Sequence, residues 1–489
     1  MISWIKQNRI ELVVLLIILA VAAILRFYKL SAYMTFLGDE GRDALVVKRI
    51  LIDHHLPLLG PTTSVGNIYL GPLYYYMMAV SMAIFWLNPI GAAGMIAAIG
   101  VATVFLVYFL ARQWFGILPA VVASFLYAIS PVNIIYSRSS WNPNPAPFFA
   151  LLAMVGFYQA RKNHNFRWLI LTGGALAAAL QMHYLALILI PVFAIFWLIE
   201  LKAFKQKKYF IQGTALAILT FAILMSPWVL FDLRHDFLNF RAITALFTQT
   251  NSAVRFDILI NLSRLWDIFD HKLIARYMVG GNNLAALLLT MMIILTVGLF
   301  RKSWAYLALG IWLLVGIVGL SFYKKDIYDH YLGFLNPVPF LLLAGLLSFL
   351  KGRLRLAVAT ILLILLSVLN LQQLPLKNPP NYQLQKTQQI AKFVISQSKD
   401  QPFNFALIAK SNYDAAYQYY LWRYQYAPKV LPIEMTDQLF VVCEDDVCNP
   451  IGHAKYEIAA FGWAKIDNAS QILGVKVYKL IHNPSGKPS

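Results

Sequence analysis

Long apolar stretches alternate with short polar ones over residues 1–375. Segments such as Gly91–Ala111, Tyr209–Phe231 and Ser303–Phe322 contain no Asp, Glu, Lys or Arg. Each holds about 20 residues or more, which at about 1.5 Å per residue is the length a helix needs to cross roughly 30 Å of hydrocarbon. Because such stretches recur along the chain, the pattern predicts a polytopic membrane protein.

The apolar pattern predicts eleven transmembrane helices. They are expected near residues 10–28, 91–111, 117–136, 146–160, 168–182, 184–199, 209–231, 283–300, 303–322, 331–350 and 356–374. Residues 168–199 are read as a hairpin that turns near His183, because one helix of that length would be about 48 Å long. Gly71–Leu87 is apolar but only about 17 residues long, and its tyrosines suit an interfacial helix that does not cross.

Basic residues indicate the orientation. With the N-terminus cytoplasmic and 11 crossings, every short basic cluster between helices falls on the cytoplasmic side, as the positive-inside rule requires. A twelfth crossing by Gly71–Leu87 would place them all outside. The clusters are Arg112; Arg161, Lys162 and Arg167; Lys202, Lys205, Lys207 and Lys208; Arg301 and Lys302; and Lys351, Arg353 and Arg355. We therefore expect a multi-pass protein, which lies in the cell membrane if its source is prokaryotic, with its C-terminal segment outside the cytoplasm.

The composition changes after Pro375. Asn378-Pro379-Pro380 ends the last apolar helix, because proline cannot continue a helix. Residues 376–489 then mix polar residues with strand-like runs at 405–408, 439–443 and 474–481. The expected fold class is therefore mainly α: a transmembrane helix bundle over 1–375, with about 11 crossings plus an interfacial helix, and a C-terminal extracytoplasmic α/β domain over 376–489.

Composition and charge exclude some classes of function. Hydrophobic residues make up 60% of the chain and the formal net charge is +19. Most basic residues lie between apolar spans, so the charge indicates membrane orientation and membrane lipids as partners, and nucleic acid is excluded. The two cysteines, Cys443 and Cys448, exclude a disulfide-rich scaffold or a Cys-based metal array, although they suit one small disulfide.

The predicted topology places several polar segments together on the outer side. They are Gly38-Asp39-Glu40-Gly41-Arg42-Asp43 in the first loop, Ser137–Pro145, the turn at His183-Tyr184, and Tyr323–Tyr331. A carboxylate there can take a proton from a hydroxyl group. Arginine and lysine can bind an anionic phosphate, and aromatic rings can stack on a sugar or line a path for a lipid tail.

Four elements of the chain occur in the order seen in one known group of enzymes. The acidic pair Asp39-Glu40, the run Gly71-Pro72-Leu73-Tyr74-Tyr75-Tyr76, the Ser137-Arg138 segment with its following prolines, and the Lys-rich loop before His330-Tyr331 together resemble the protein O-mannosyltransferase and aminoarabinose transferase group of GT-C glycosyltransferases. The resemblance covers roughly residues 1–350. It implies a multi-helix membrane fold and a hexosyl- or pentosyltransferase. It also implies a polyprenyl- or dolichyl-phosphate sugar donor and transfer on the non-cytoplasmic side, usually with inversion.

The resemblance assigns roles to particular residues. Asp39 matches the essential loop aspartate of the group and is the candidate general base, with Glu40 as a supporting carboxylate. The group often has another aspartate in the second outer loop, where this chain has Asn142 and Asn144. These are candidates for the substrate or donor cleft, because asparagine can hydrogen-bond a substrate, although it cannot take a proton. The remaining candidates are Arg138, Lys324 and Lys325 for the donor phosphate, and His330 and Tyr331 near the donor.

Three further residues are candidates for contact with the substrate or donor cleft. Arg42 follows the acidic pair and can instead pair with Asp43, Tyr74 opens the interfacial segment, and His183 lies at the hairpin turn. His54 and His55 lack the spacing of a metal site, so no resident metal or cofactor is expected, although a need for a divalent ion stays open.

The sequence also leaves alternatives open. A lipid or solute transporter or flippase without glycosyl transfer is the main one, although such proteins usually carry ionisable residues inside their spans. The identity of the sugar, the donor's chain length and the acceptor (protein, lipid or glycan) are not specified by the pattern.

Overall fold

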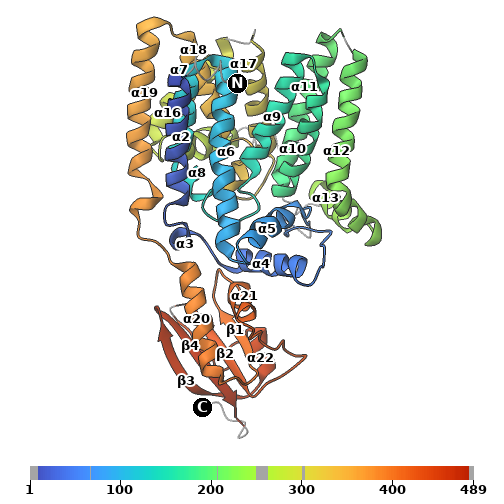
Figure 1. Cartoon of the computed structure of the whole chain (residues 1–489), viewed down its shortest axis with the longest axis vertical. Helices are drawn as coiled ribbons and strands as arrows, with labels where there is room; N and C mark the ends of the chain where they lie inside the picture. Colours follow the sequence, from blue (N-terminus) through green and yellow to red (C-terminus); the bar gives the residue numbers. More distant parts are fainter. Residues whose placement is uncertain are drawn as a thin grey trace. The chain divides into compact units, whose positions relative to one another are not determined.

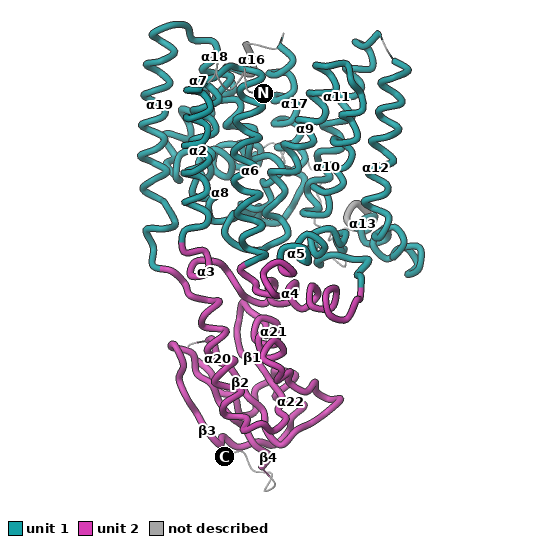
Figure 2. The backbone as a smooth tube through the Cα atoms, in the orientation of Figure 1, with its two compact units in different colours: residues 1–28, 56–81, 91–379 teal, residues 29–55, 82–90, 380–489 magenta. Residues whose placement is uncertain are grey.

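The structure is a computed structural model of the whole chain that describes residues 9–65, 68–205, 207–248, 263–299, 303–445 and 447–483. The chain forms two compact units (Figure 2). The first unit comprises residues 1–28, 56–81 and 91–379, and the second comprises 29–55, 82–90 and 380–489. The second unit therefore contains the Asp39 loop together with the C-terminal segment, whereas the sequence pattern grouped that loop with the helical part.

The first unit is helical, and each apolar segment predicted from the sequence forms a helix where the structure describes it. Its main helices are α2 (Arg9–Phe27), α6 (Pro89–Phe115), α7 (Ile117–Ile129), α8 (Pro131–Ile135), α9 (Ala146–Asn163), α10 (Leu169–Met182), α11 (Leu189–Ala203), α12 (Lys207–Arg234), α13 (Leu238–Thr248), α16 (Asn283–Leu299), α17 (Trp304–Ser321), α18 (Pro337–Phe349) and α19 (Gly352–Gln372). Helices α9, α10 and α12 pack side by side (Figure 1).

Two helix boundaries differ from the expectation because of proline. The predicted helix 117–136 is divided into α7 and α8 at Pro131, which has no backbone N–H to continue the hydrogen-bond ladder. The predicted helix 331–350 begins only at Pro337, which suits the first turn of a helix. Residues Asp329–Leu332 before it form the short 3₁₀ helix η4.

Among the described residues, six helices are long and apolar enough to cross a membrane, or seven if the bent pair Ser263–Met278 and Asn283–Thr296 counts as one span. These helices make the chain an integral membrane protein. Four other apolar helices have 10–17 residues, among them α5 (Leu73–Ile84). With 12 residues α5 is about 18 Å long, too short to cross alone. The count of 11 crossings stays a prediction.

Basic and acidic side chains pair at one end of the first unit. Arg112 near the end of α6 bonds Glu11 near the start of α2 at 2.7 Å, and Arg161 near the end of α9 bonds Glu200 on α11 at 2.8 Å. Lys162 also donates to Gln113, so these helix ends lie together. Arg301 and Lys302 lie outside the described residues. The loops with Asn142 and His183 precede the other ends of α9 and α11.

The second unit contains a four-stranded sheet with the order β1-β2-β4-β3. Its strands are β1 (Asn404–Ile408), β2 (Gln438–Cys443), β3 (Ala464–Ile472) and β4 (Val475–His482), and only the β1–β2 pair is parallel. The helices of this unit are α3 (Leu30–Tyr33), α4 (Gly38–Leu51), α20 (Gln383–Ser398), α21 (Ala415–Arg423) and α22 (Tyr456–Phe461).

The predicted runs at 405–408, 439–443 and 474–481 correspond to β1, β2 and β4. Strand β3 was missed because most of its side chains are polar and exposed. Cys443 and Cys448 form the small disulfide that the sequence allowed.

Candidate active site

The acidic pair lies in the first turn of α4 in the second unit. Carboxylates are favoured there because the unpaired N–H groups carry partial positive charge. The Leu37 N–H donates to Oε2 of Glu40 at 3.0 Å, which closes the start of the helix. Glu40 is buried, whereas the Asp39 side chain is 43% exposed. The two neighbouring acids therefore meet different surroundings, and only Asp39 is open to solvent.

Burial also changes the titration of Glu40. Loss of solvation raises the pKa of Glu40 to about 7, against the opposing effect of the Leu37 N–H. The nearby carboxylates of Asp39 and Asp43 raise it further. A large fraction of Glu40 is therefore protonated at neutral pH, which suits a supporting role and limits repulsion with Asp39.

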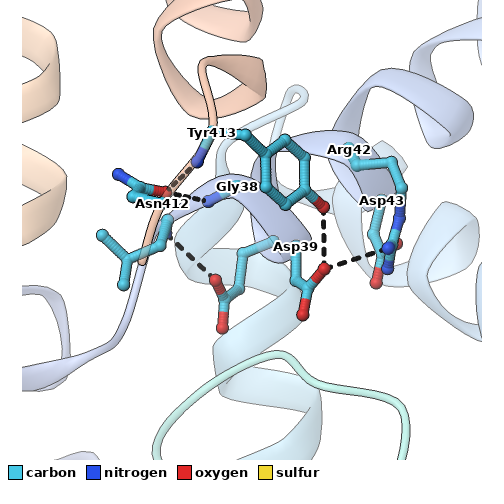
Figure 3. A network of polar contacts seen from close by, with 8 residues as sticks. Gly38, Asp39, Arg42, Asp43, Asn412 and Tyr413 are labelled. Atoms are coloured by element: carbon cyan, nitrogen blue, oxygen red, sulfur yellow. Dashed lines mark hydrogen bonds and ion pairs between the residues drawn. The ribbon is translucent and has the colours of Figure 1, made fainter. Parts of the chain in front are cut away.

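Arg42 bridges two acids of the same helix. Its Nη1 donates to Oδ1 of Asp39 at 2.9 Å, and its Nη2 donates to Oδ1 of Asp43 at 2.7 Å (Figure 3). The expected pairing of Arg42 with Asp43 is thus present, and it extends to Asp39. Because its charge is shared by two carboxylates, Arg42 orients Asp39 more readily than it binds a separate anion.

A second group of predicted residues gathers in the first unit. The rings of His183 and Tyr331 lie 4.9 Å apart between centroids, and those of His330 and Tyr331 lie 4.5 Å apart. The Tyr331 hydroxyl also shares a hydrogen bond of 2.9 Å with the hydroxyl of Ser64. The hairpin turn, η4 and the loop before α5 therefore meet at one aromatic cluster.

Both histidines of this cluster are neutral at pH 7. Burial lowers the pKa of His183 to about 3, with His330 adding repulsion, and burial lowers the pKa of His330 to about 4. They can offer a ring face or a hydrogen bond, and they supply no positive charge for a phosphate.

The two asparagines hold the loop before α9. Asn142 donates to the Met182 carbonyl at 2.8 Å, and Asn144 donates to the Ser139 carbonyl at 2.8 Å. Oδ1 of Asn144 and Nδ1 of His330 are buried, and neither has a hydrogen-bond partner among the described residues. Both residues line a cavity of about 20 Å³, together with Asn133, Ser137 and Asn336. That volume holds a single water molecule and cannot hold a sugar.

Arg138 and Tyr74 are buried and have structural contacts. The Arg138 guanidinium donates to the Leu25, Arg26 and Tyr28 carbonyls at 2.6–3.1 Å, so it caps the C-terminal end of α2. The Tyr74 hydroxyl bonds that of Ser140 at 2.7 Å, which fixes α5 to the Asn142 loop. A role of Arg138 in phosphate binding stays a prediction, and it would require this cap to open.

Lys324 and Lys325 are exposed in the loop after α17. Sequence reasoning missed two cations beside them: Arg264 donates to the Lys325 carbonyl at 3.0 Å, and Arg276 pairs with Asp329 at 2.6 Å. Both lie in the segment between α13 and α16, where no local motif distinguishes them. The structure thus brings Asn142, His183, His330 and Tyr331 together in one unit, and Asp39, Glu40 and Arg42 in the other.

Parts of the chain are similar in sequence to known proteins. Residues 70–230 match the family model for dolichyl-phosphate-mannose-protein mannosyltransferase. The protein described as "Putative mannosyltransferase YkcB" from Bacillus subtilis (strain 168) is 26% identical over 46% of this chain, and an uncharacterized protein of Aquifex aeolicus (strain VF5) is 28% identical over 44%. The chain spans 31% and 42% of the length of these relatives.

Solved structures match nearly the whole chain. ArnT from Cupriavidus metallidurans, bound to undecaprenyl phosphate, has a TM-score of 0.63 at 13% identity, covering 97% of this chain and 99% of its own. The oligosaccharyltransferase AglB from Archaeoglobus fulgidus, in complex with an inhibitory peptide and a dolichol-phosphate, has a TM-score of 0.57 at 15% identity, covering 90% of this chain and 70% of its own. The chain has the GT-C glycosyltransferase fold, so the resemblance expected from its motifs is confirmed.

Proposed function

We propose that this protein is a membrane glycosyltransferase that moves a sugar from a polyprenyl- or dolichyl-phosphate donor to an acceptor hydroxyl on the non-cytoplasmic face. The observation that carries the proposal is how the two carboxylate oxygens of Asp39 are hydrogen-bonded. Its Oδ1 accepts hydrogen bonds from Arg42 and Tyr413, while its Oδ2 accepts none from the part of the chain that the structure describes. An oriented carboxylate with one open oxygen is what a general base requires. The GT-C fold and the mannosyltransferase match over residues 70–230 support the same reading.

In the proposed reaction, Oδ2 of Asp39 takes the proton of the acceptor hydroxyl. The acceptor oxygen forms a bond to the anomeric carbon of the sugar, and the bond from that carbon to the phosphate oxygen breaks. The electron pair leaves with the polyprenyl phosphate, and the proton ends on Asp39. Attack opposite to the leaving phosphate inverts the anomeric configuration.

The departing phosphate needs positive charge, because its negative charge grows as the bond to the sugar breaks. Lys324 and Lys325 are the best candidates, since both are exposed in the loop after α17. Arg138 is a candidate only if its guanidinium gives up its hydrogen bonds to the carbonyls at the end of α2. The neutral rings of His330 and Tyr331 are assigned to contact with the donor, which needs no charge.

A lipid-linked donor also needs an apolar place for its tail. The first unit has an apolar cavity of about 590 Å³ lined by Trp266, Phe269 and Ile311 with residues of α16 and α17. Such a cavity suits an isoprenoid chain, because burial of apolar surface stabilises the bound lipid. We assign this cavity to part of the donor tail.

One feature supports a non-cytoplasmic placement of the second unit. Its Cys443–Cys448 disulfide is typical of oxidising compartments. The pairing of Arg112 and Arg161 at one end of the first unit agrees with a single basic, cytoplasmic end.

The experiment that tests the function uses the purified full-length protein in lipid nanodiscs. It is incubated with a panel of polyprenyl-phosphate sugars and with candidate protein, lipid and glycan acceptors. We expect at least one donor to be converted to free polyprenyl phosphate with formation of a new glycoside. Movement of lipid across reconstituted bilayers without any glycosidic bond forming would instead indicate a transporter or flippase.

A further inference from the structure

The C-terminal segment contacts the Asp39 loop directly within the second unit. The hydroxyl of Tyr413 donates to Oδ1 of Asp39 at 2.7 Å, and the Gly38 N–H donates to Oδ1 of Asn412 at 2.8 Å (Figure 3). Asn412 and Tyr413 follow β1 and precede α21. A residue of the C-terminal sheet region therefore touches the carboxylate proposed as the base.

The segment that carries Tyr413 is itself held by the sheet. Nδ2 of Asn412 donates to Oε2 of Glu444 at 2.8 Å, and Glu444 directly follows β2. The Tyr417 hydroxyl donates to the other oxygen of Glu444 at 2.6 Å. Hydrogen bonds to a carboxylate are among the stronger ones in proteins, so Asn412 has a fixed orientation. Tyr413 is thus presented to Asp39 by a rigid support.

Helix α4 packs closely against α21, and this packing restricts movement of the first turn of α4. A Cβ atom at Gly41 would lie 2.2 Å from the backbone nitrogen of Ala416, which cannot move aside. A Cβ atom at Gly38 would lie 2.4 Å from the ring of Tyr413. The glycines on either side of Asp39-Glu40 therefore permit an approach that no other residue allows, and this approach places the Tyr413 hydroxyl within reach of Asp39.

The contact has a chemical consequence for Asp39. The donors of Tyr413 and Arg42 both act on Oδ1, which fixes the rotation of the carboxylate and directs Oδ2 away from them. Burial, together with the hydrogen bond to Asp39, raises the pKa of the Tyr413 hydroxyl, so it stays a donor at neutral pH. Tyr413 therefore orients the carboxylate and leaves its proton chemistry to Asp39.

We infer that Tyr413 is a positioning residue for Asp39, and that the C-terminal segment completes the catalytic site of this chain. The inference rests on the proposed function, because it assigns Tyr413 a role in the transfer that Asp39 initiates. It also assigns the C-terminal domain a role in orienting Asp39, which the sequence motifs did not indicate.

The test measures kcat and KM for donor and acceptor in full-length Y413F in nanodiscs. Loss of one orienting hydrogen bond should lower kcat by about 10- to 100-fold, while each KM stays within about twofold of wild type. Y426F is the matched control, because the Tyr426 hydroxyl donates to Asp400 on an exposed part of the same unit. We expect Y426F to turn over at the wild-type rate.

A second variant separates orientation from folding. Incorporation of 4-aminophenylalanine at position 413 keeps an N–H donor and the ring, so it should restore most of the kcat that Y413F loses. A wild-type kcat in Y413F, or failure of the amino analogue to restore activity in folded protein, would overturn the inference. Those outcomes leave the wild-type enzyme active, whereas failure of the proposed function means that the wild-type protein itself transfers no sugar.

Discussion

Replacement of Glu40 with Gln tests how burial of this carboxyl group, in the first turn of α4, makes stability depend on pH. Glu40 is 6% exposed, and burial raises its pKa from the ordinary value of 4.5 to about 7. The folded state therefore holds the proton more tightly than the unfolded state. Between pH 4.5 and 7 the folded state binds more protons, so its stability falls as the pH rises through this window.

The structure sets the magnitude of this effect. One pKa unit corresponds to about 1.36 kcal/mol, so the full difference is roughly 3 kcal/mol, of which about 2.5 kcal/mol is lost between pH 5 and pH 8. The amide of E40Q can accept the same hydrogen bond from the Leu37 N–H, and it carries no charge at any of these pH values. The variant should therefore lack this pH dependence, even if its buried NH₂ group lowers stability by a constant amount.

Hydrogen exchange followed by mass spectrometry measures the free energy of local opening of α4. Rates between pH 5 and pH 8 are corrected for intrinsic exchange, and wild type, E40Q and E434Q are compared. Glu434 pairs with Lys429 and is 50% exposed, so E434Q applies the same chemical change at a solvated site. We expect wild type and E434Q to lose stability in α4 as the pH rises, and E40Q to stay level. An equal pH slope in E40Q and wild type would show that Glu40 does not cause the pH dependence of α4 stability.

Two further predictions concern the first unit. Burial lowers the pKa of His330 to about 4, so the unfolded state takes up the proton first on acidification, and stability should fall by about 2 kcal/mol between pH 7 and pH 5. Thermal unfolding in detergent should show that H330Q loses less stability than wild type over this range, by about this amount, since His183 still contributes its own loss. Arg161→Leu removes the partner of the Glu200 carboxylate, which is 2% exposed, and should cost about 1–3 kcal/mol. The added change E200Q should recover part of that loss, and no coupling between the two changes would contradict the ion pair.

Much of the helical fold could be predicted because membrane helices need long uncharged stretches, which the sequence displays directly. The division of 117–136 at Pro131 depends on a single residue whose effect on a long apolar run is local. Strand β3 could not be predicted in the same way, since its exposed polar side chains carry no apolar alternation. The pattern of hydrophobic residues predicts helices and strands that have a buried side. It does not predict a strand such as β3, whose side chains are mostly exposed.

The candidate site was predictable only where residues are close in sequence. Asp39, Glu40 and Arg42 form a local motif at a helix start, so their cooperation could be inferred. Tyr413 is one of 26 tyrosines and lies 374 positions from Asp39, so no local signal marks it. For Arg138, the position in the sequence suggested phosphate binding. In the structure its guanidinium donates hydrogen bonds to carbonyls at the end of α2, contacts that no local motif indicates.

The role of Asp39 as general base is tested by the turnover of D39N with a donor that wild type accepts. D53N is the matched control, because Asp53 follows the same helix and its side chain is 44% exposed, against 43% for Asp39. Loss of a general base should lower kcat of D39N by about 10²- to 10⁴-fold, with D53N close to wild type. Wild-type turnover by folded, membrane-inserted D39N would show that this carboxylate does not activate the acceptor.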